Sequence, residues 1–137
     1  MKVLNIATRT RCCMMDVSRE ISRAVKDSHV ENGVCVVYVP HTTAGVTINE
    51  NADPDVARDM LTALSDMVPK LAYRHMEGNS DAHIKAALVG TSETVIIEGG
   101  ALQLGTWQGI YLCEFDGPRT RKMFIRIIPA DGRHKGG

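Results

Sequence analysis

Three strand patterns follow one another in the last third of the chain, with no helical pattern between them. Residues 94–98, 107–115 and 123–128 are rich in β-branched and aromatic side chains, and turn sequences at 99–100 and 116–119 separate them. This succession is typical of a β meander. The helical patterns all lie earlier in the chain, which predicts the α+β class rather than an alternating parallel sheet.

The first half of the chain begins with a β-rich segment at 3–8, followed by an amphipathic helix over 16–30. Asp16 can accept hydrogen bonds from the first turn of this helix, and Gly33 offers a residue able to adopt positive φ after its end. An unbroken β-branched run over 34–39 then predicts a strand that is buried on both faces.

A second strand pattern covers 41–50, and Asp53 and Pro54 then begin a helix that Pro69 prevents from continuing. The apolar stripe expected for this helix is Val56, Ala57, Met60, Leu61 and Leu64. After a polar stretch over 72–79, Asn79 or Ser80 caps a short helix that ends at Gly90. Its expected apolar face is Ile84, Ala87 and Leu88.

Length and charge limit the possible functions. The 137 residues contain no repeat or linker, so we expect a single domain over 1–137 with one core. Sixteen Lys and Arg balance sixteen Asp and Glu, which argues against a protein that binds nucleic acid or a membrane surface through bulk positive charge. Without a long apolar segment or a signal-peptide pattern, we expect a soluble, cytoplasmic protein.

The four cysteines contain no CxxC pair, and we interpret them mainly as small buried hydrophobic residues. A disulfide or a thiolate metal site remains the alternative, and the role of Cys12 and Cys13 is open. GxGxxG, P-loop and GxSxG patterns are absent from the sequence, which removes the usual dinucleotide, P-loop and serine-hydrolase functions.

Three of the five histidines stand beside turn and cap positions. His41 ends the 34–39 strand region after Pro40, His75 lies in the polar stretch, and His83 lies in the first turn of the short helix. A loop between His75 and His83 can bring both rings to one point. Two imidazoles with a third histidine or a carboxylate are the minimum for a catalytic zinc or similar divalent site. Three separate, hydrogen-bonded histidines remain the simpler alternative.

Two further groups of polar residues could do chemistry. Glu50, which follows the second strand together with Asn51, could act as a metal ligand or general base if it is buried beside a histidine. Gln108 lies at the start of a later strand, in which Gly109 permits close approach of a ligand or of another part of the chain. Alternation along this strand predicts two faces: one with Trp107, Gly109, Tyr111, Cys113 and Phe115, and the other with Gln108, Ile110, Leu112, Glu114 and Asp116. Asp116 and Arg119 flank the turn at the end of this strand. The guanidinium suits phosphate or carboxylate, although such a pair is often purely structural.

These residues lie in stretches that resemble the YjbQ-like family, also described as secondary thiamine-phosphate synthase: 41–56, 75–83, 105–108 and 115–119. The resemblance runs in order over essentially the whole chain. It implies an α+β fold with a Greek-key β-sandwich and a few short helices, assembled as a homotrimer. It also implies a divalent metal, zinc or magnesium, bound by histidines, and a low thiamine-phosphate-forming activity.

Carried to this chain, the resemblance implies metal ligands at His41, His75 and His83. It implies catalytic roles for Glu50, Gln108, Asp116 and Arg119, and binding of a small phosphorylated metabolite by Thr42, Thr43, Asn51, Asn79 and Arg119. The alternative function is a metal- or phosphate-binding trimer, or a hydrolase of another phosphorylated metabolite. Because a short chain leaves little room for a deep pocket, we expect the site near a subunit interface.

Overall fold

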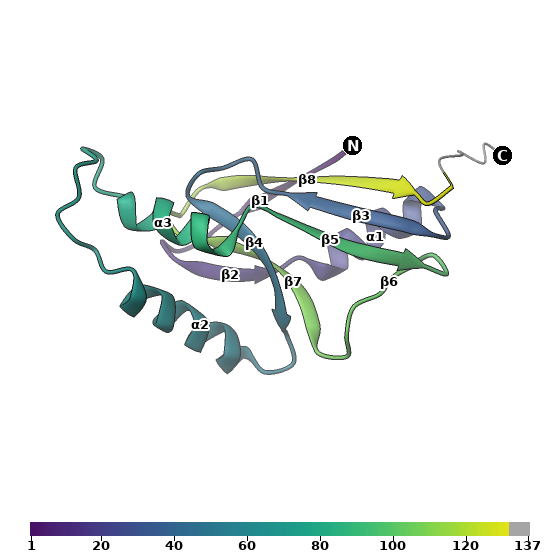
Figure 1. Cartoon of the computed structure of the whole chain (residues 1–137), viewed down its shortest axis with the longest axis horizontal. Helices are drawn as coiled ribbons and strands as arrows, with labels where there is room; N and C mark the ends of the chain where they lie inside the picture. Colours follow the sequence, from purple (N-terminus) through teal and green to yellow (C-terminus); the bar gives the residue numbers. More distant parts are fainter. Residues whose placement is uncertain (132–137) are drawn as a thin grey trace.

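Two antiparallel sheets and three helices make up the fold in the computed structural model, which describes residues 1–131 (Figure 1). The larger sheet has the order β1 (Lys2–Ala7), β8 (Thr120–Pro129), β3 (Gly33–Tyr38), β5 (Ser92–Glu98) and β6 (Ala101–Leu102). The smaller sheet has the order β2 (Cys13–Asp16), β7 (Gln108–Glu114) and β4 (Ala44–Glu50). The helices are α1 (Ser18–Ser28), α2 (Pro54–Met67) and α3 (Ser80–Val89).

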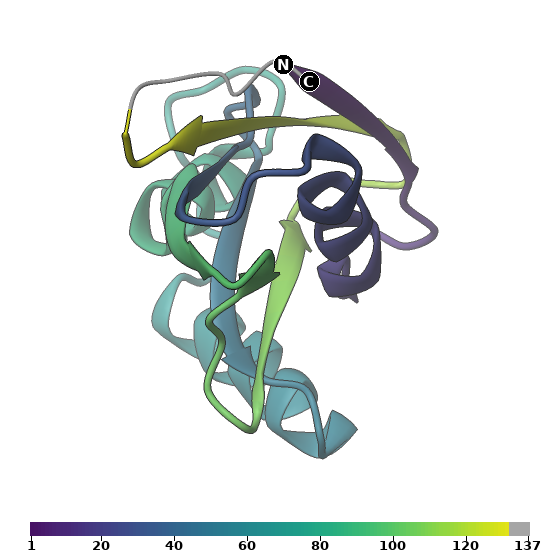
Figure 2. The same ribbon diagram turned by 90° about the vertical axis from the view of Figure 1, so that its right-hand side faces the viewer.

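Consecutive strands repeatedly change sheet: β1 and β2, β3 and β4, and β7 and β8 each lie in different sheets. Figure 2 shows β8 and β1 along one side of the molecule, β4 and β7 running away from them, and α1 beside β7. The predicted α+β class with a β-sandwich is therefore confirmed. The strands expected at 94–98, 107–115 and 123–128 are present as β5, β7 and β8. The short strands β2 and β6 were not predicted.

The core lies between the sheets and is closed on one side by α1. Ile110 and Leu112 of β7 belong to it, together with buried residues of α1, β3, β4, β5 and β8. The alternate residues Tyr111, Cys113 and Phe115 face the other way and pack in a second cluster with residues of α2 and α3. The two faces predicted for this strand are confirmed, because successive side chains of a strand point to opposite sides of its sheet.

The helix boundaries confirm two of the predicted caps and correct a third. The carboxylate of Asp16 accepts from the Ser18 N–H at 2.9 Å, and that of Asp53 accepts from the Asp55 N–H at 2.9 Å. The prediction for Gly33 is wrong, because His29 ends α1 with φ of 56°. Gly33 instead lies in β3, where a Cβ atom would collide with the carbonyl of Ile128 on the neighbouring strand.

The buried face of α3 is the opposite of the one predicted. Ile84, Ala87 and Leu88 are exposed, whereas the buried residues are Asp81, Ala82, Lys85 and Ala86. Two small alanines let the helix approach the sheet closely. The charges are tolerated because Asp81 pairs with Arg11 (3.1 Å) and Lys85 (3.8 Å). Size and ion pairing, rather than the count of apolar residues, select the inward face.

Burial in β3 also differs from the prediction. Cys35 and Val37 are fully buried, but Val34 and Val36 on the other face are half-buried and Tyr38 is exposed. The run is therefore covered on one face only in the single chain. On the outer face of the larger sheet, Tyr38, Ile96 and Ile128 are exposed, and the ring of Tyr38 lies beside that of Phe124.

The cysteines divide into two classes. Cys35 and Cys113 are buried, and burial raises the pKa of their thiols to about 11 and about 12. Cys12 and Cys13 are half-buried, and all four are free thiols. None of the helices within residues 1–131 is long and apolar enough to span a membrane. Residues 133–137, where the sequence placed no motif, lie outside the described part.

Candidate functional site

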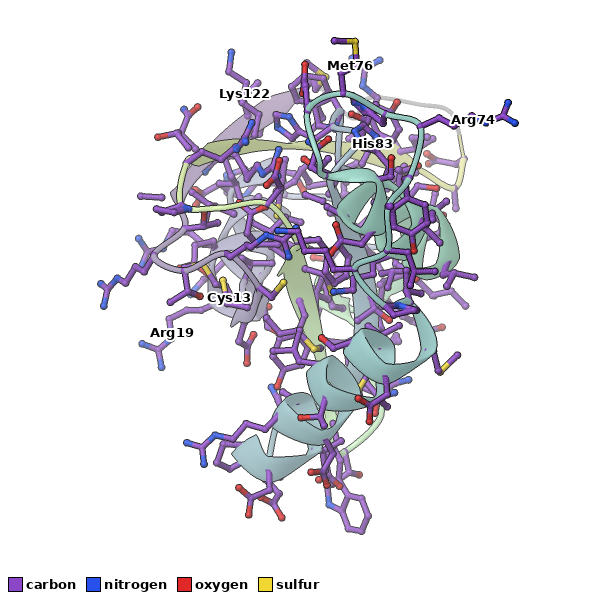
Figure 3. All side chains as sticks on the ribbon, turned by 90° about the vertical axis from the view of Figure 1, so that its left-hand side faces the viewer. Cys13, Arg19, Arg74, Met76, His83 and Lys122 are labelled. Carbon is purple, nitrogen blue, oxygen red and sulfur yellow. The ribbon has the colours of Figure 1, made fainter. Side chains whose placement is uncertain are left out.

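His75 and His83 come together at one end of the smaller sheet. His83 lies in the first turn of α3 and His75 in the connection between α2 and α3, and their ring centroids are 5.3 Å apart with the planes tilted by 51°. Gly78, with φ of 72°, helps to turn the connection back toward the helix. Figure 3 shows His83 at the same end of the molecule as Arg74, Met76 and Lys122. The loop closure that the sequence allowed is therefore present.

An amide, a carboxylate and a guanidinium lie in contact at this end. The Asn79 Nδ2 donates to Asp116 Oδ2 at 2.9 Å, and Arg119 Nη2 donates to the same oxygen at 3.2 Å. Arg119 Nε also donates to the Asp116 carbonyl at 2.8 Å. The Asn79 side chain thus does not cap α3, although the residue occupies the cap position. Its buried Oδ1 has no hydrogen-bond donor within the described residues.

The ring of His41 is held in a different way from the other two. Its Nε2 accepts from the Lys122 backbone N–H at 2.9 Å. Burial and the nearby positive charge of Arg121 lower its pKa, so the imidazole is neutral near pH 7. A neutral ring whose Nε2 accepts must carry its proton on Nδ1. In this arrangement, His41 offers an N–H donor rather than a lone pair for a metal ion.

Below these residues lies a buried ion pair that sequence reasoning missed. Glu114 is fully buried at the end of β7, and Arg121 of β8 donates to both of its carboxylate oxygens. Thr8 donates to Glu114 at 2.7 Å, and Arg121 Nη2 donates to the Thr43 hydroxyl at 2.7 Å. The available signal was the position of Glu114 on the face of β7 that carries Ile110 and Leu112. Of the two predicted phosphate-binding threonines, Thr43 is engaged here, whereas Thr42 is exposed.

Glu50, Asn51 and Gln108 lie at the opposite end of the smaller sheet. Asn51 Nδ2 donates to Asp16 Oδ2 at 3.0 Å, and the Tyr111 hydroxyl donates to the Glu50 carbonyl at 3.0 Å. Gln108 Oε1 accepts from the Gly105 N–H at 2.8 Å. The Asn51 side chain packs against Gly109, as the predicted close approach at this glycine requires. A Cβ atom at position 109 would lie 2.5 Å from Asn51 Nδ2, so a larger residue would collide with it.

Two cavities meet beside these residues. One of about 410 Å³ lies at the start of α1 and includes Asp16, Arg19 and Asn51 in its lining. The other, of about 380 Å³, lies between β2 and α2 and is lined by Asp16, Asn51, Tyr111 and both half-buried cysteines. Burial, together with the charges of Asp16 and Glu50, raises the pKa of Tyr111. Hydrogen bonds to Asp16 from Ser18 and Asn51 outweigh the opposing effect of burial and lower its pKa.

The predicted site residues thus fall into two groups within one chain. We call His41, His75, Asn79, His83, Asp116 and Arg119 the histidine end. The acidic end consists of Glu50, Asn51 and Gln108 together with Asp16, which the sequence predicted only as a helix cap. The β4–β7 ladder separates them, with Ala44 opposite Glu114 and Glu50 opposite Gln108. Six residue steps along a strand span about 20 Å. Among residues 1–131, no three His, Cys, Asp or Glu side chains form a group that could hold a metal ion.

Residues 2–130 match the family model described as "UPF0047 protein YjbQ-like". The chain is 51% identical to the UPF0047 protein YugU of Bacillus subtilis over 130 residues, covering 93% of this chain and 98% of that protein. It is 53% identical over 124 residues to a UPF0047 protein of Methanocaldococcus jannaschii, covering 90% of each.

Solved structures give the same result. A crystal structure of an uncharacterised YjbQ/UPF0047 protein from Clostridium acetobutylicum superposes with a TM-score of 0.92 at 53% identity, covering 93% of this chain and all of that one. A protein of unknown function from Sulfolobus solfataricus has a TM-score of 0.89 at 29% identity, covering 92% of this chain and 94% of its own. The arrangement of sheets and helices described above is shared with these proteins.

Proposed function

Because the chain belongs to the YjbQ-like UPF0047 family, we propose that it is an enzyme of phosphorylated metabolites that forms thiamine phosphate. The reaction joins a hydroxymethylpyrimidine diphosphate to a thiazole phosphate. The thiazole nitrogen forms a bond to the pyrimidine methylene carbon while the bond from that carbon to the diphosphate oxygen breaks, and pyrophosphate leaves. The observation that carries the proposal is the approach of His75 to His83 beside the Asn79–Asp116–Arg119 group.

The donor set at the histidine end fits a divalent metal ion in part. The imidazoles of His75 and His83 are close enough to serve one ion, whereas the Nε2 of His41 is already used by the Lys122 N–H. Imidazole nitrogen suits zinc better than magnesium, which prefers oxygen ligands, so zinc is the better candidate. When bound, such an ion would neutralise charge on the diphosphate.

The remaining groups at this end suit anionic oxygens. The Arg119 side chain is about half exposed and is held by Asp116 at both Nε and Nη2, which fixes the plane of its guanidinium. Arg119 and the Nδ1–H of His41 would donate to phosphate, and Asp116 would position Arg119. The Asn79 Oδ1, which lacks a donor among the described residues, would accept from a substrate amino or hydroxyl group.

The proposal is tested by measuring thiamine phosphate formation from the two substrates with zinc present. We expect the His75→Ala and His83→Ala variants to lose about tenfold or more of the activity, the scale seen when metal sites are weakened. Lys70→Ala, an exposed position in the same connection, is the matched control and should keep wild-type activity. If the wild type and the three variants form thiamine phosphate at equal rates, the histidine end takes no part in this reaction. Tight zinc binding with turnover of a different phosphorylated compound would favour the alternative of a hydrolase.

A further inference from the structure

Within residues 1–131, the histidine end has two metal ligands, one fewer than a zinc site with an open position uses. Protein zinc sites with an open position have three protein ligands. Here the His75–His83 pair supplies two, and residues 1–131 place no third His, Cys, Asp or Glu side chain with them in a metal-binding group. Glu77, the nearest acidic partner, lies 3.9 Å from His75 Nε2 and is largely exposed. Zinc bound at this pair with an open position would therefore need a third ligand that this group of residues does not supply.

The acidic end has the complementary property, because it holds polar side-chain groups to which residues 1–131 offer no hydrogen bond or ion pair. The Glu50 side chain receives no hydrogen bond and makes no ion pair with the described residues, where only its backbone atoms are bonded. Gln108 Oε1 accepts a hydrogen bond from the Gly105 N–H, whereas Nε2 donates no hydrogen bond within residues 1–131. Both side chains are reached from solvent. A carboxylate ligand and an amide donor are therefore available about 20 Å from the histidines along the β4–β7 ladder.

The charges at the two ends are opposite in sign. Exposed Arg74, Arg119 and Lys122 lie at the histidine end, two of them labelled there in Figure 3. Glu77 and Asp116 offset part of this positive charge. The other end carries Asp16, Glu50, Asp53 and Asp55, partly offset by Arg19 and Arg58. Oppositely charged patches of this kind orient two copies end to end and disfavour contacts between like ends.

Large apolar side chains stand exposed beside both ends. Trp107, directly before Gln108, is 64% exposed, and Met76, directly after His75, is completely exposed. Aromatic residues and methionine are enriched in the cores of protein interfaces. Trp107 lies beside the acidic end and Met76 beside the histidine end. Both side chains could therefore anchor a contact that brings the two ends together.

We infer that the site is completed between two copies of this chain, with Glu50 and Gln108 of one copy placed against His75 and His83 of the next. The inference rests on the histidine site of the proposed function and names the neighbouring copy as its missing part. Glu50 supplies the third metal ligand, and Gln108 donates to the bound anion or to Asn79 Oδ1. A head-to-tail contact uses two different surfaces of each chain, so it closes into a ring when the rotation permits. The trimer expected for this family is such a ring.

The test uses rings that contain two kinds of damaged chain. His83→Ala and Glu50→Ala chains carry different affinity tags, are expressed together and are purified through both tags, so that every ring contains both. The probe is zinc ion, counted per chain by native mass spectrometry. In a closed trimer of either composition, one contact of three joins an intact histidine end to an intact Glu50, so we expect about a third of the wild-type zinc content. Each variant alone should retain little zinc.

Several results would overturn the inference. Mixed rings without zinc would place all the ligands in one chain, and wild-type zinc content in Glu50→Ala alone would remove Glu50 from the site. A wild-type protein that is monomeric or binds no zinc would also contradict it. Asp27→Ala, an exposed carboxylate on α1 that belongs to neither end, is the matched control and should bind zinc as wild type does. Zinc recovery in mixed rings that form no thiamine phosphate would overturn the proposed function alone.

Discussion

Glu114 and Arg121 place two opposite charges in the interior beneath the histidine end. Arg121 also bonds Thr43, at the end of the loop that carries His41, and its charge helps to keep His41 neutral. The pair therefore connects the core to the site. The turn that follows Glu114 positions Asp116 and Arg119, and the Glu114 carboxylate accepts from the Asp116 N–H at 3.1 Å. A buried carboxylate with this many donors fixes the local backbone.

This pair predicts a specific loss of stability in acid. Burial favours the neutral form, but hydrogen bonds from Arg121 and Thr8 outweigh it and lower the pKa of Glu114 below its ordinary value of 4.5. As the pH falls, the Glu114 carboxylate is protonated in the unfolded chain before it is protonated in the folded chain. Its contribution to the free energy of unfolding is complete above the ordinary pKa and is lost as the pH falls through the folded-state pKa. In urea unfolding between pH 3 and pH 7, Glu114→Gln should show a shallower decline below about pH 4.5 than the wild type.

At pH 7 the same variant leaves Arg121 buried without its partner. We expect Glu114→Gln to lower the free energy of unfolding by about 3–5 kcal/mol, the cost of breaking a buried ion pair on one side. A variant as stable as the wild type at pH 7, or one whose stability falls equally steeply in acid, would show that the pair has no net effect.

At the scale of whole elements, periodicity predicted most of the helices and strands. Strand β7 was placed with both of its faces, because apolar residues alternate along it on either side. Strand β2 lacks such alternation, since Cys13, Met14 and Met15 are all half-buried. The inward face of α3 was predicted wrongly, because the pattern cannot reveal that Arg11, 70 residues away, neutralises Asp81. Long-range pairing of this kind leaves no local signal.

The orientation of α3 can be tested by comparing a buried charge with an exposed alanine. Asp81→Ala leaves Lys85 buried without its partner, and we expect it to lower the free energy of unfolding by about 2 kcal/mol or more, allowing for the partial exposure of Arg11. Ala87→Ser, on the face that periodicity predicted as buried, should cost about 0.5 kcal/mol or less, the helix-propensity difference. Urea unfolding measures both. The reverse order would mean that the helix packs through its apolar face.

At the scale of the whole molecule, the neutral formal charge conceals an uneven distribution, with Asp16, Glu50, Asp53 and Asp55 gathered at the acidic end. The sequence predicted candidate site residues at both ends, because they lie in stretches that resemble the family. It could not separate them, since His41 and Glu50 are nine positions apart in the chain yet stand at opposite ends of β4. Sequence analysis also placed His41 with the metal ligands. Only the hydrogen bond from the Lys122 backbone, 81 residues away, distinguishes it from the other two.

The most direct test of this account is an anomalous difference map at the zinc absorption edge, from crystals of the wild-type protein grown with zinc and never exposed to chelator. We predict a peak bonded to His75 and His83 at about 2.0–2.1 Å, with Glu50 of a neighbouring copy as the third protein ligand. A peak at another place, or one ligated by side chains of a single chain alone, would contradict the shared site.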